Sequence, residues 1–146
     1  MRTKTWVEHT AEVLRDAGYR SGEARAAVIE VLGEQECCVD AQAIFDRVRE
    51  RGRRRVGIAS VYRTLDLLSE LGLVQRLDVG GGGAHFEPVR PDGEHHHHVV
   101  CDDCGRVSAF ADPGLEQALD ALARRLDFRV GAHEVVLRGA CGDCAG

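Results

Sequence analysis

Two short cysteine motifs, Cys101-x-x-Cys104 and Cys141-x-x-Cys144, constrain this chain more than any other feature of its sequence. A Cys-x-x-Cys segment bends so that both sulfurs face one point, and two such segments can enclose one tetrahedral ion. Four thiolates form the closed shell of a structural zinc site, with zinc–sulfur distances near ~2.3 Å and no open position for catalysis. The alternative is a pair of redox motifs or disulfides. We predict a zinc site that fixes the last residues to the preceding sheet.

A run of four histidines, His95 to His98, stands directly before the first cysteine motif. In an extended segment, alternate side chains point to opposite faces, which separates His96 and His98 from His95 and His97. One strand could therefore supply two further metal sites. The run lies inside the chain, which argues against an affinity tag, and a solvated polar loop is the other alternative. Candidate partner ligands elsewhere in the sequence are Cys38, Glu87, Glu116 and His133.

The length of 146 residues suits one ordinary domain or two small ones that share a core. The sequence shows neither a secretory signal nor an apolar run of the ~20 residues that a membrane span needs, so we expect a cytoplasmic protein. Six cysteines in that compartment favour metal or thiol chemistry over disulfides. Residues 80–146 carry six basic and eleven acidic residues and account for the net charge of −5, which suits cation binding, while residues 1–79 are neutral.

The N-terminal half shows the helix–helix–helix–hairpin order that is typical of a winged helix-turn-helix. Apolar residues at helical spacing predict helices over 6–17, after a cap at Ser21, after a cap at Asp40, and from a cap at Ser60 to position 71. Two strands follow at 73–77 and 84–87, around the glycine run 80–83. Short helices followed by a hairpin also occur in proteins that bind no DNA, so this order alone does not establish the function.

The exposed face of the fourth helix favours DNA binding. Its first turns carry side chains of the kind that a recognition helix presents to base edges and phosphates, namely Ser60, Tyr62, Arg63 and Thr64. Three arginines just before the helix, Arg53, Arg54 and Arg55, could contact phosphates. The alternative for these arginines is a solvated charged turn.

The composition changes near residue 90, where Pro88, Pro91, Asp92 and Gly93 form a polar link. We place a domain boundary there, which gives a DNA-binding domain over 1–89 and a metal-binding dimerisation domain over 90–146. Strands are expected at 99–101, 107–110 and 128–138, with a helix at 115–126. The predicted class is α+β, a winged helix-turn-helix domain followed by a small α/β domain.

From about Arg20 onward, the chain resembles the ferric uptake regulator (Fur) superfamily of metal-dependent repressors. The resemblance rests on four stretches: the segment 57–65 (Gly-Ile-Ala-Ser-Val-Tyr-Arg-Thr-Leu), Phe86-Glu87, the segment 95–105, and the terminal Cys-x-x-Cys. It implies an N-terminal winged-helix domain, a C-terminal dimerisation domain, and a homodimer that binds palindromic operators in double-stranded DNA when metal is loaded.

The resemblance also implies three metal sites at defined positions. The structural zinc falls on the four cysteines named above. The regulatory site falls on Cys38, Glu87, His96 and His98, and a second site in the dimerisation domain falls on His95, His97, Glu116 and His133. The role of residues 1–19 lies outside the resemblance, which leaves them with a predicted helix only.

The regulatory site departs from the iron-sensing pattern of the family. Cys38 stands where iron sensors usually have His, and Ala109 replaces an acidic residue that some of them use. Thiolate with imidazole suits zinc better than manganese or magnesium, so we favour zinc, with Fe²⁺ as the alternative. Two residues argue against zinc as the regulatory metal: Val89 stands where zinc sensors often have Cys, and Glu87 looks more Fur-like. Glu87 argues against the peroxide sensors, which use Asp in key positions.

Two side chains near the regulatory site have no assigned role. Cys37, beside Cys38, could replace it as a ligand or confer thiol sensitivity, and nothing in the sequence decides between these. His85 remains a possible alternative ligand.

Two other classes of function are weighed against the repressor. His85-Phe86-Glu87 with Cys101-x-x-Cys104 resembles the His-x-Glu and Cys-x-x-Cys of zinc nucleobase deaminases. That pattern needs Pro before the first Cys, where this chain has Val100, and it leaves the second cysteine motif and the histidine run without a role. A zinc-storage or interaction module would share the metal sites but have no affinity for an operator.

Overall fold

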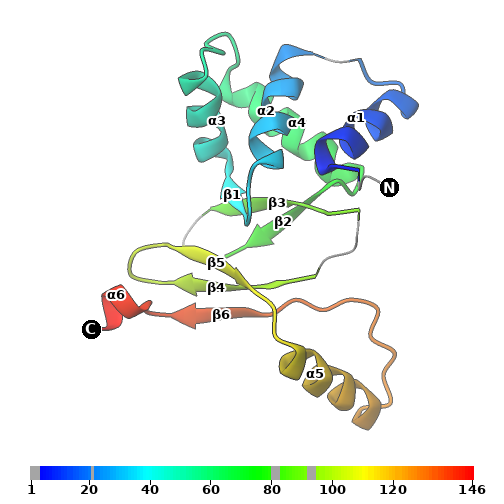
Figure 1. Cartoon of the computed structure of the whole chain (residues 1–146), viewed down its shortest axis with the longest axis vertical. Helices are drawn as coiled ribbons and strands as arrows, with labels where there is room; N and C mark the ends of the chain where they lie inside the picture. Colours follow the sequence, from blue (N-terminus) through cyan, green and yellow to red (C-terminus); the bar gives the residue numbers. More distant parts are fainter. Residues whose placement is uncertain (1–3, 21, 80–82, 92–94) are drawn as a thin grey trace. The chain divides into compact units, whose positions relative to one another are not determined.

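The computed structural model describes residues 4–20, 22–79, 83–91 and 95–146. These residues form two compact units, Met1–Glu94 and His95–Gly146, which are described separately (Figure 1). Ser21, glycines 80–82 of the predicted wing turn, and residues 92–94 of the predicted link lie outside the described residues.

The first unit contains four helices, α1 (Trp6–Asp16), α2 (Glu23–Gly33), α3 (Ala41–Glu50) and α4 (Ile58–Glu70). Side-chain caps fix two of their starts. Thr5 forms a capping box with Glu8 at α1, and the Asp40 carboxylate accepts a hydrogen bond from the Ala43 N–H at α3. The predicted cap of α3 is therefore confirmed. Helix α2 begins after Gly22, which offers no side-chain cap.

Helix α4 begins two residues before the predicted cap. Its N-cap is Gly57, so Ser60 lies within the first turn of the helix. The expectation of a Ser60 cap is wrong, because Ile58 and Ala59 continue the helix toward the N-terminus. Gly72, with φ +71, confirms the predicted end, since a left-handed residue stops the helix at a position that glycine tolerates.

A three-stranded antiparallel sheet completes the first unit, with β3 (Ala84–Pro88) between β1 (Val39–Asp40) and β2 (Val74–Asp78). The two longer strands confirm the predicted hairpin. Strand β1 was not expected, because two residues are too few to show an alternating pattern. It pairs Val39 with Phe86, which places the residues before α3 beside β3.

The apolar faces of the four helices and the sheet meet in one core. Leu32, Ile44, Leu65 and Leu68 are completely buried in it. Trp6 joins this core and donates its indole N–H to the Leu73 carbonyl oxygen at 2.9 Å. Helix α1, for which the sequence predicted only a helix, is thus an integral part of the first unit.

The second unit is a three-stranded sheet with β4 (His97–Cys101) between β5 (Val107–Phe110) and β6 (Val136–Gly139), accompanied by α5 (Pro113–Arg125) and α6 (Gly142–Ala145). Strand β5 pairs antiparallel and β6 parallel to β4. The predicted strand at 128–138 is wrong in its first eight residues, because Phe128 and Val130 are exposed and the strand begins only at Val136. Apolar residues at that position indicated a strand, but they have no sheet neighbour.

Helix α5 extends away from the β4–β6 sheet (Figure 1) and buries none of its residues within the chain. Leu122 is 40% exposed, and Leu126, just beyond the helix, is 64% exposed. Leu115 and Leu119 are only partly buried, so the apolar face of this amphipathic helix is left incompletely covered and suits a partner. None of the helices in the described part of the chain has the length and apolar character needed to cross a membrane.

Candidate functional site

The four cysteines of the two Cys-x-x-Cys motifs come together in the second unit. The pairing of Cys101 with Gly139 in the β4–β6 ladder brings the end of β4 beside the start of the second motif. All four sulfurs lie within 4.8 Å of one another, and those of Cys104 and Cys141 are 3.9 Å apart. Gly105, with φ +76, closes the turn of the first motif. All six cysteines of the chain are free thiols, and these four could hold one tetrahedral ion.

Backbone N–H groups favour thiolate in this cluster. The Cys141 N–H donates to Cys101 Sγ at 3.3 Å, and hydrogen bonds of this kind from Cys141 and Cys104 lower the pKa of the Cys101 thiol to about 6. Contacts with the sulfurs of Cys141 and Cys101 raise the pKa of Cys144 to about 12. Four sulfurs this close cannot all be thiolates without a cation, so the cluster suits a divalent ion that displaces the remaining protons.

Two ion pairs link the loops of the two cysteine motifs. Arg106 donates to Asp143 at 3.1 Å, and Arg138 pairs with Asp102. Both pairs are exposed and each contributes little to stability. Each pair joins residues that lie far apart in the chain, so no local spacing in the sequence predicts it.

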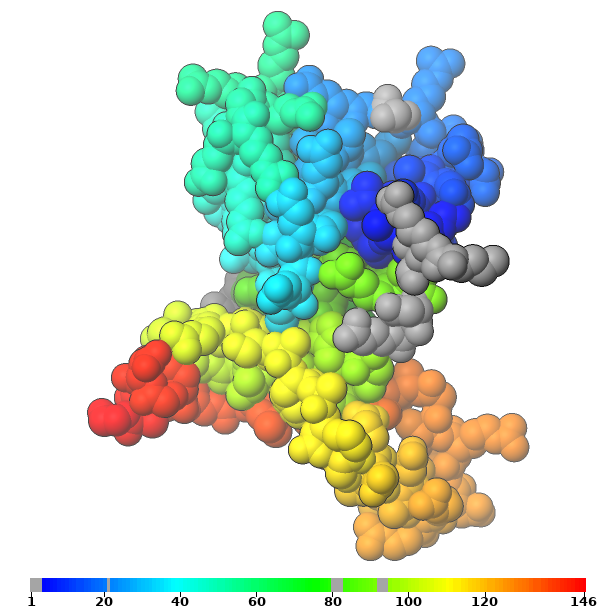
Figure 2. All heavy atoms as spheres, in the orientation of Figure 1, coloured from blue at the N-terminus to red at the C-terminus, as the bar shows by residue number. Residues whose placement is uncertain are grey.

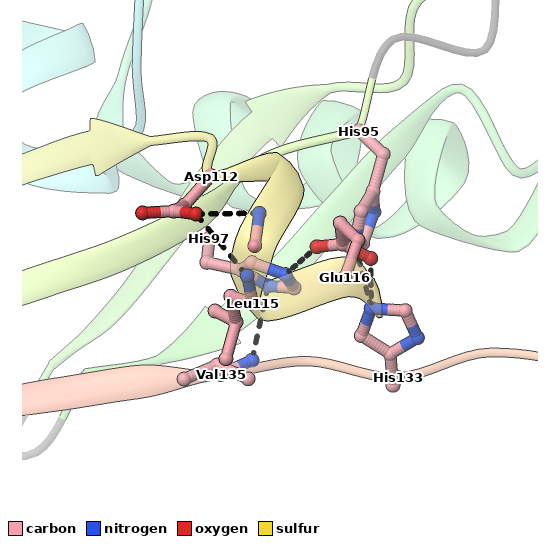
Figure 3. A network of polar contacts seen from close by, with 8 residues as sticks. His95, His97, Asp112, Leu115, Glu116, His133 and Val135 are labelled. Atoms are coloured by element: carbon pink, nitrogen blue, oxygen red, sulfur yellow. Dashed lines mark hydrogen bonds and ion pairs between the residues drawn. The ribbon is translucent and has the colours of Figure 1, made fainter. Parts of the chain in front are cut away.

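A second cluster in the same unit joins three imidazoles to one carboxylate (Figure 3). Glu116 Oε1 lies 2.5 Å from His97 Nε2, and Glu116 Oε2 lies 2.7 Å from His133 Nε2. His95 Nε2 is 3.2 Å from His133 Nε2. The candidate ligand atoms lie within 4.8 Å of one another, which suits one transition-metal ion with nitrogen and oxygen ligands.

Two sets of backbone hydrogen bonds position this second cluster. Asp112 accepts hydrogen bonds from the Gly114 and Leu115 N–H groups, which fixes the first turn of α5 and with it Glu116. The Val135 N–H donates to His97 Nδ1 at 3.2 Å and orients a ring that is completely buried (Figure 3). The hydrogen bond to His97, followed by that to His133, lowers the pKa of Glu116 below 4.5. No sequence signal pointed to the contact with Val135.

The four residues predicted for the regulatory site are divided between the two units. In the second unit, the rings of His96 and His98 stand 5.1 Å apart between centroids. In the first unit, the β1–β3 register, in which Val39 pairs with Phe86, places Cys38 beside Glu87. Each unit thus brings its own two candidate ligands together.

Cys38 lies close to a second thiol. Its sulfur is 3.6 Å from that of Cys37. This contact, then burial, raises the pKa of Cys38 above its ordinary value of 9.0, and the Glu87 carboxylate adds to the effect. His85, the possible alternative ligand, pairs with Asp40 and Leu77 on neighbouring strands, and its buried Nδ1 has no hydrogen-bond partner among the residues that the structure describes.

Helix α4 presents part of its predicted DNA-binding face to solvent. Tyr62 is 51% exposed, Arg63 is exposed, and Ser60 is partly exposed and accepts from Arg63 at 3.1 Å. Thr64 differs from the prediction. It is 6% exposed, and its hydroxyl donates to the Ser60 carbonyl oxygen at 2.9 Å, because it lies on the side of the helix that carries Leu65 and Leu68.

The arginines between α3 and α4 differ in their surroundings. Arg53 lies 4.0 Å from Glu23 and 3.9 Å from Glu30 on α2. Arg54 and Arg55 are exposed. Figure 2 shows that the blue-green stretch of the chain after α3 projects from the surface. The two exposed arginines are the better placed to contact phosphate.

Known proteins match this chain along most of its length. The sequence signature described as "Ferric uptake regulator family" matches residues 16–138. The ferric uptake regulation protein of Legionella pneumophila is 36% identical over 135 residues, which cover 92% of this chain and 97% of that protein.

Solved structures agree with these matches. The ferric uptake regulator of Vibrio cholerae is similar with a TM-score of 0.80 at 32% identity, over 90% of this chain and 99% of that one. A zinc-bound manganese uptake regulator is similar with a TM-score of 0.76 at 28% identity, over 94% and 99%. The predicted fold, a winged helix-turn-helix domain followed by a small α/β dimerisation domain, is confirmed. This chain belongs to the ferric uptake regulator family of metal-responsive transcriptional regulators.

Proposed function

We propose that this regulator is a zinc-responsive repressor of metal uptake and homeostasis genes that acts in the cytoplasm. The observation that carries the proposal is the Cys38 thiol beside Glu87, because a sulfur donor suits zinc better than manganese or magnesium. The regulatory site would use Cys38 and Glu87 from a DNA-binding domain over 1–89, with His96 and His98 from a dimerisation domain over 90–146.

Zinc would act by selecting one arrangement of the two domains. A site with ligands from both domains binds metal well only when the domains bring those ligands together, so metal shifts the population toward that arrangement. A shift from mostly open to mostly closed needs roughly 10⁴-fold preferential binding, about 5.5 kcal/mol. In a homodimer, the selected arrangement would space two α4 helices to match successive major grooves of a palindromic operator.

The other two clusters would have supporting roles. We assign structural Zn²⁺ to Cys101, Cys104, Cys141 and Cys144, whose closed sulfur shell leaves no position for substrate. We assign a second metal site to His95, His97, Glu116 and His133. Regulators of this family bind operator DNA as dimers, and a second copy of this chain would cover the exposed apolar face of α5.

An iron-responsive repressor is the second candidate. The relative from Legionella pneumophila is named a ferric uptake regulation protein, and Glu87 adds an oxygen donor that suits iron. The deaminase alternative is rejected, because proteins of this family are transcription regulators and not enzymes.

Metal content followed by titration separates the two candidates. Full-length protein is purified without a tag, its bound zinc is measured, and Zn²⁺, Fe²⁺ or Mn²⁺ is added against palindromic promoter DNA at fixed free-metal concentrations. We expect about one tightly held zinc per chain and activation of DNA binding at the lowest free concentration by Zn²⁺. Activation by Fe²⁺ at a lower free concentration than Zn²⁺ would replace the zinc proposal with the iron one.

Replacing Arg63 by alanine tests the DNA-binding face of α4. We expect zinc-loaded Arg63→Ala to lose about 1–3 kcal/mol of operator affinity if the side chain reads a base edge. A phosphate contact would instead lower the salt dependence of binding by about one unit of slope. Fluorescence anisotropy at several salt concentrations measures both quantities. Arg129→Ala, in the second unit, is the charge-matched control, and equal losses in the two variants would contradict the assignment.

A further inference from the structure

The adjacent cysteines Cys37 and Cys38 form a thiol pair that lies outside the four-cysteine cluster. In a regular extended segment, neighbouring side chains point to opposite faces. Here the chain bends at Glu36 and Cys37, just before β1, and the two sulfurs approach to 3.6 Å. Both residues are partly buried. The local backbone therefore turns two consecutive thiols toward one point.

The separation of the two sulfurs fits a shared metal ion. Two thiolates on one tetrahedral ion, each at ~2.3 Å, stand about 3.8 Å apart. Cys104 and Cys141, which belong to the four-cysteine cluster of the same chain, are separated by 3.9 Å. The pair at 3.6 Å thus has nearly the same sulfur–sulfur spacing as the candidate structural zinc site.

The same geometry does not favour a disulfide between these residues. Consecutive Cα atoms are about 3.8 Å apart, whereas disulfides usually join Cα atoms about 4.4–6.8 Å apart. A bridge between Cys37 and Cys38 would therefore strain the backbone. An ion that accepts both sulfurs at their present spacing needs no such rearrangement.

A third donor and an access route lie in the same unit. The β1–β3 register places Glu87 beside Cys38. Both cysteines also line an open hollow together with Glu34, Glu36 and Glu50, and with Arg47 and Arg51. Arg51 pairs with Glu34, so part of the positive charge is neutralised within the hollow. A cation can reach the two sulfurs through this hollow.

We propose that Cys37 is a metal ligand, and that Cys37 and Cys38 together form a two-thiolate clamp for a thiophilic divalent cation, with Glu87 as a third donor. The inference rests on the proposed regulatory site, to which it adds one sulfur. A second thiolate strengthens the preference for zinc over iron and manganese, because those ions favour nitrogen and oxygen donors. All donors of the clamp belong to the first unit, so this unit by itself supplies the sulfur ligands that favour zinc.

Cobalt spectroscopy on the full-length protein counts the sulfur donors. Co²⁺ binds such sites less tightly than Zn²⁺ and leaves tightly held structural zinc in place. Thiolate-to-cobalt charge-transfer absorption is then compared for the unmodified protein, Cys37→Ser, Cys38→Ser and the double variant. We expect the intensity per bound ion to fall to about half in each single variant and to vanish in the double variant, as the two sulfur donors are removed. Glu36→Gln, in the same bend, is the control and should leave the spectrum unchanged.

Zinc-activated operator binding, measured on the same variants, separates this inference from the proposed function. A Cys37→Ser spectrum equal to that of the unmodified protein would overturn the clamp, and zinc-activated DNA binding by that variant would leave the zinc-responsive function standing. A halved spectrum without any activation of the unmodified protein by Zn²⁺ would establish the clamp and contradict the zinc-responsive function.

Discussion

Replacing Cys141 by serine is expected to remove the tightly held zinc and unfold most of the second unit. Cys141 provides one of four sulfurs within 4.8 Å of one another, and its N–H donates to Cys101 Sγ. The second unit has few other sources of stability, because α5 buries none of its residues within the chain. Structural zinc sites contribute roughly 10–16 kcal/mol of binding free energy. This is as large as the whole free energy of unfolding of a typical domain, so the second unit should not stay folded without the ion.

The measurement combines zinc content per chain with hydrogen exchange of the backbone amides in 95–146. We expect zinc to fall well below one per chain and the protection of β4 and β6 to disappear, while the first unit keeps its protected core. Asp143→Asn is the matched control. Asp143 lies inside the same motif, but its side chain forms an exposed ion pair with Arg106 and is not a sulfur ligand. A Cys141→Ser protein with full zinc content and a protected sheet would contradict the structural assignment.

Replacing His98 by alanine is expected to abolish zinc-dependent operator binding and to leave a folded dimer. His98 is one of two imidazole donors in the proposed regulatory site, and the ring of His96 stands 5.1 Å from it. Removing a residue that only hydrogen-bonds to a metal ligand lowers metal affinity roughly 10–100-fold. Removing a ligand itself should therefore lower it at least on the order of 100-fold. The metal would then lack the preferential affinity that shifts the domains.

The His98 experiment measures operator affinity with and without Zn²⁺, together with dimer mass and circular dichroism. His98 is 1% exposed and its removal could loosen the sheet, so His96→Ala, at a partly exposed position, serves as a second variant. His9→Ala, on α1, is the matched histidine control. Zinc-dependent binding that persists at full strength in both His96→Ala and His98→Ala would contradict the regulatory site.

The sequence by itself predicted the order of the main helices and strands and the four cysteines that come together in the second unit. Helical periodicity predicted the four helices of the first unit, and the Asp40 cap was readable because its side chain bonds to the N–H three residues later. The Cys-x-x-Cys spacing identified a sulfur cluster because each motif can fold onto a single point. Helix periodicity, helix caps and metal-binding spacings depend on residues a few positions apart, so they can be predicted from the sequence.

Only the tertiary structure decided which distant groups meet. Glu116 joins His97 and His133 because α5 is capped at Asp112 and the segment before β6 runs beside β4. The burial of Thr64 and the exposure of Phe128 and Val130 also depend on neighbours that no local pattern specifies. The same holds for the sulfurs of Cys37 and Cys38, which lie 3.6 Å apart because of a backbone bend that no sequence pattern predicts. Contacts between distant segments are set by packing and backbone pairing, which depend on the whole chain.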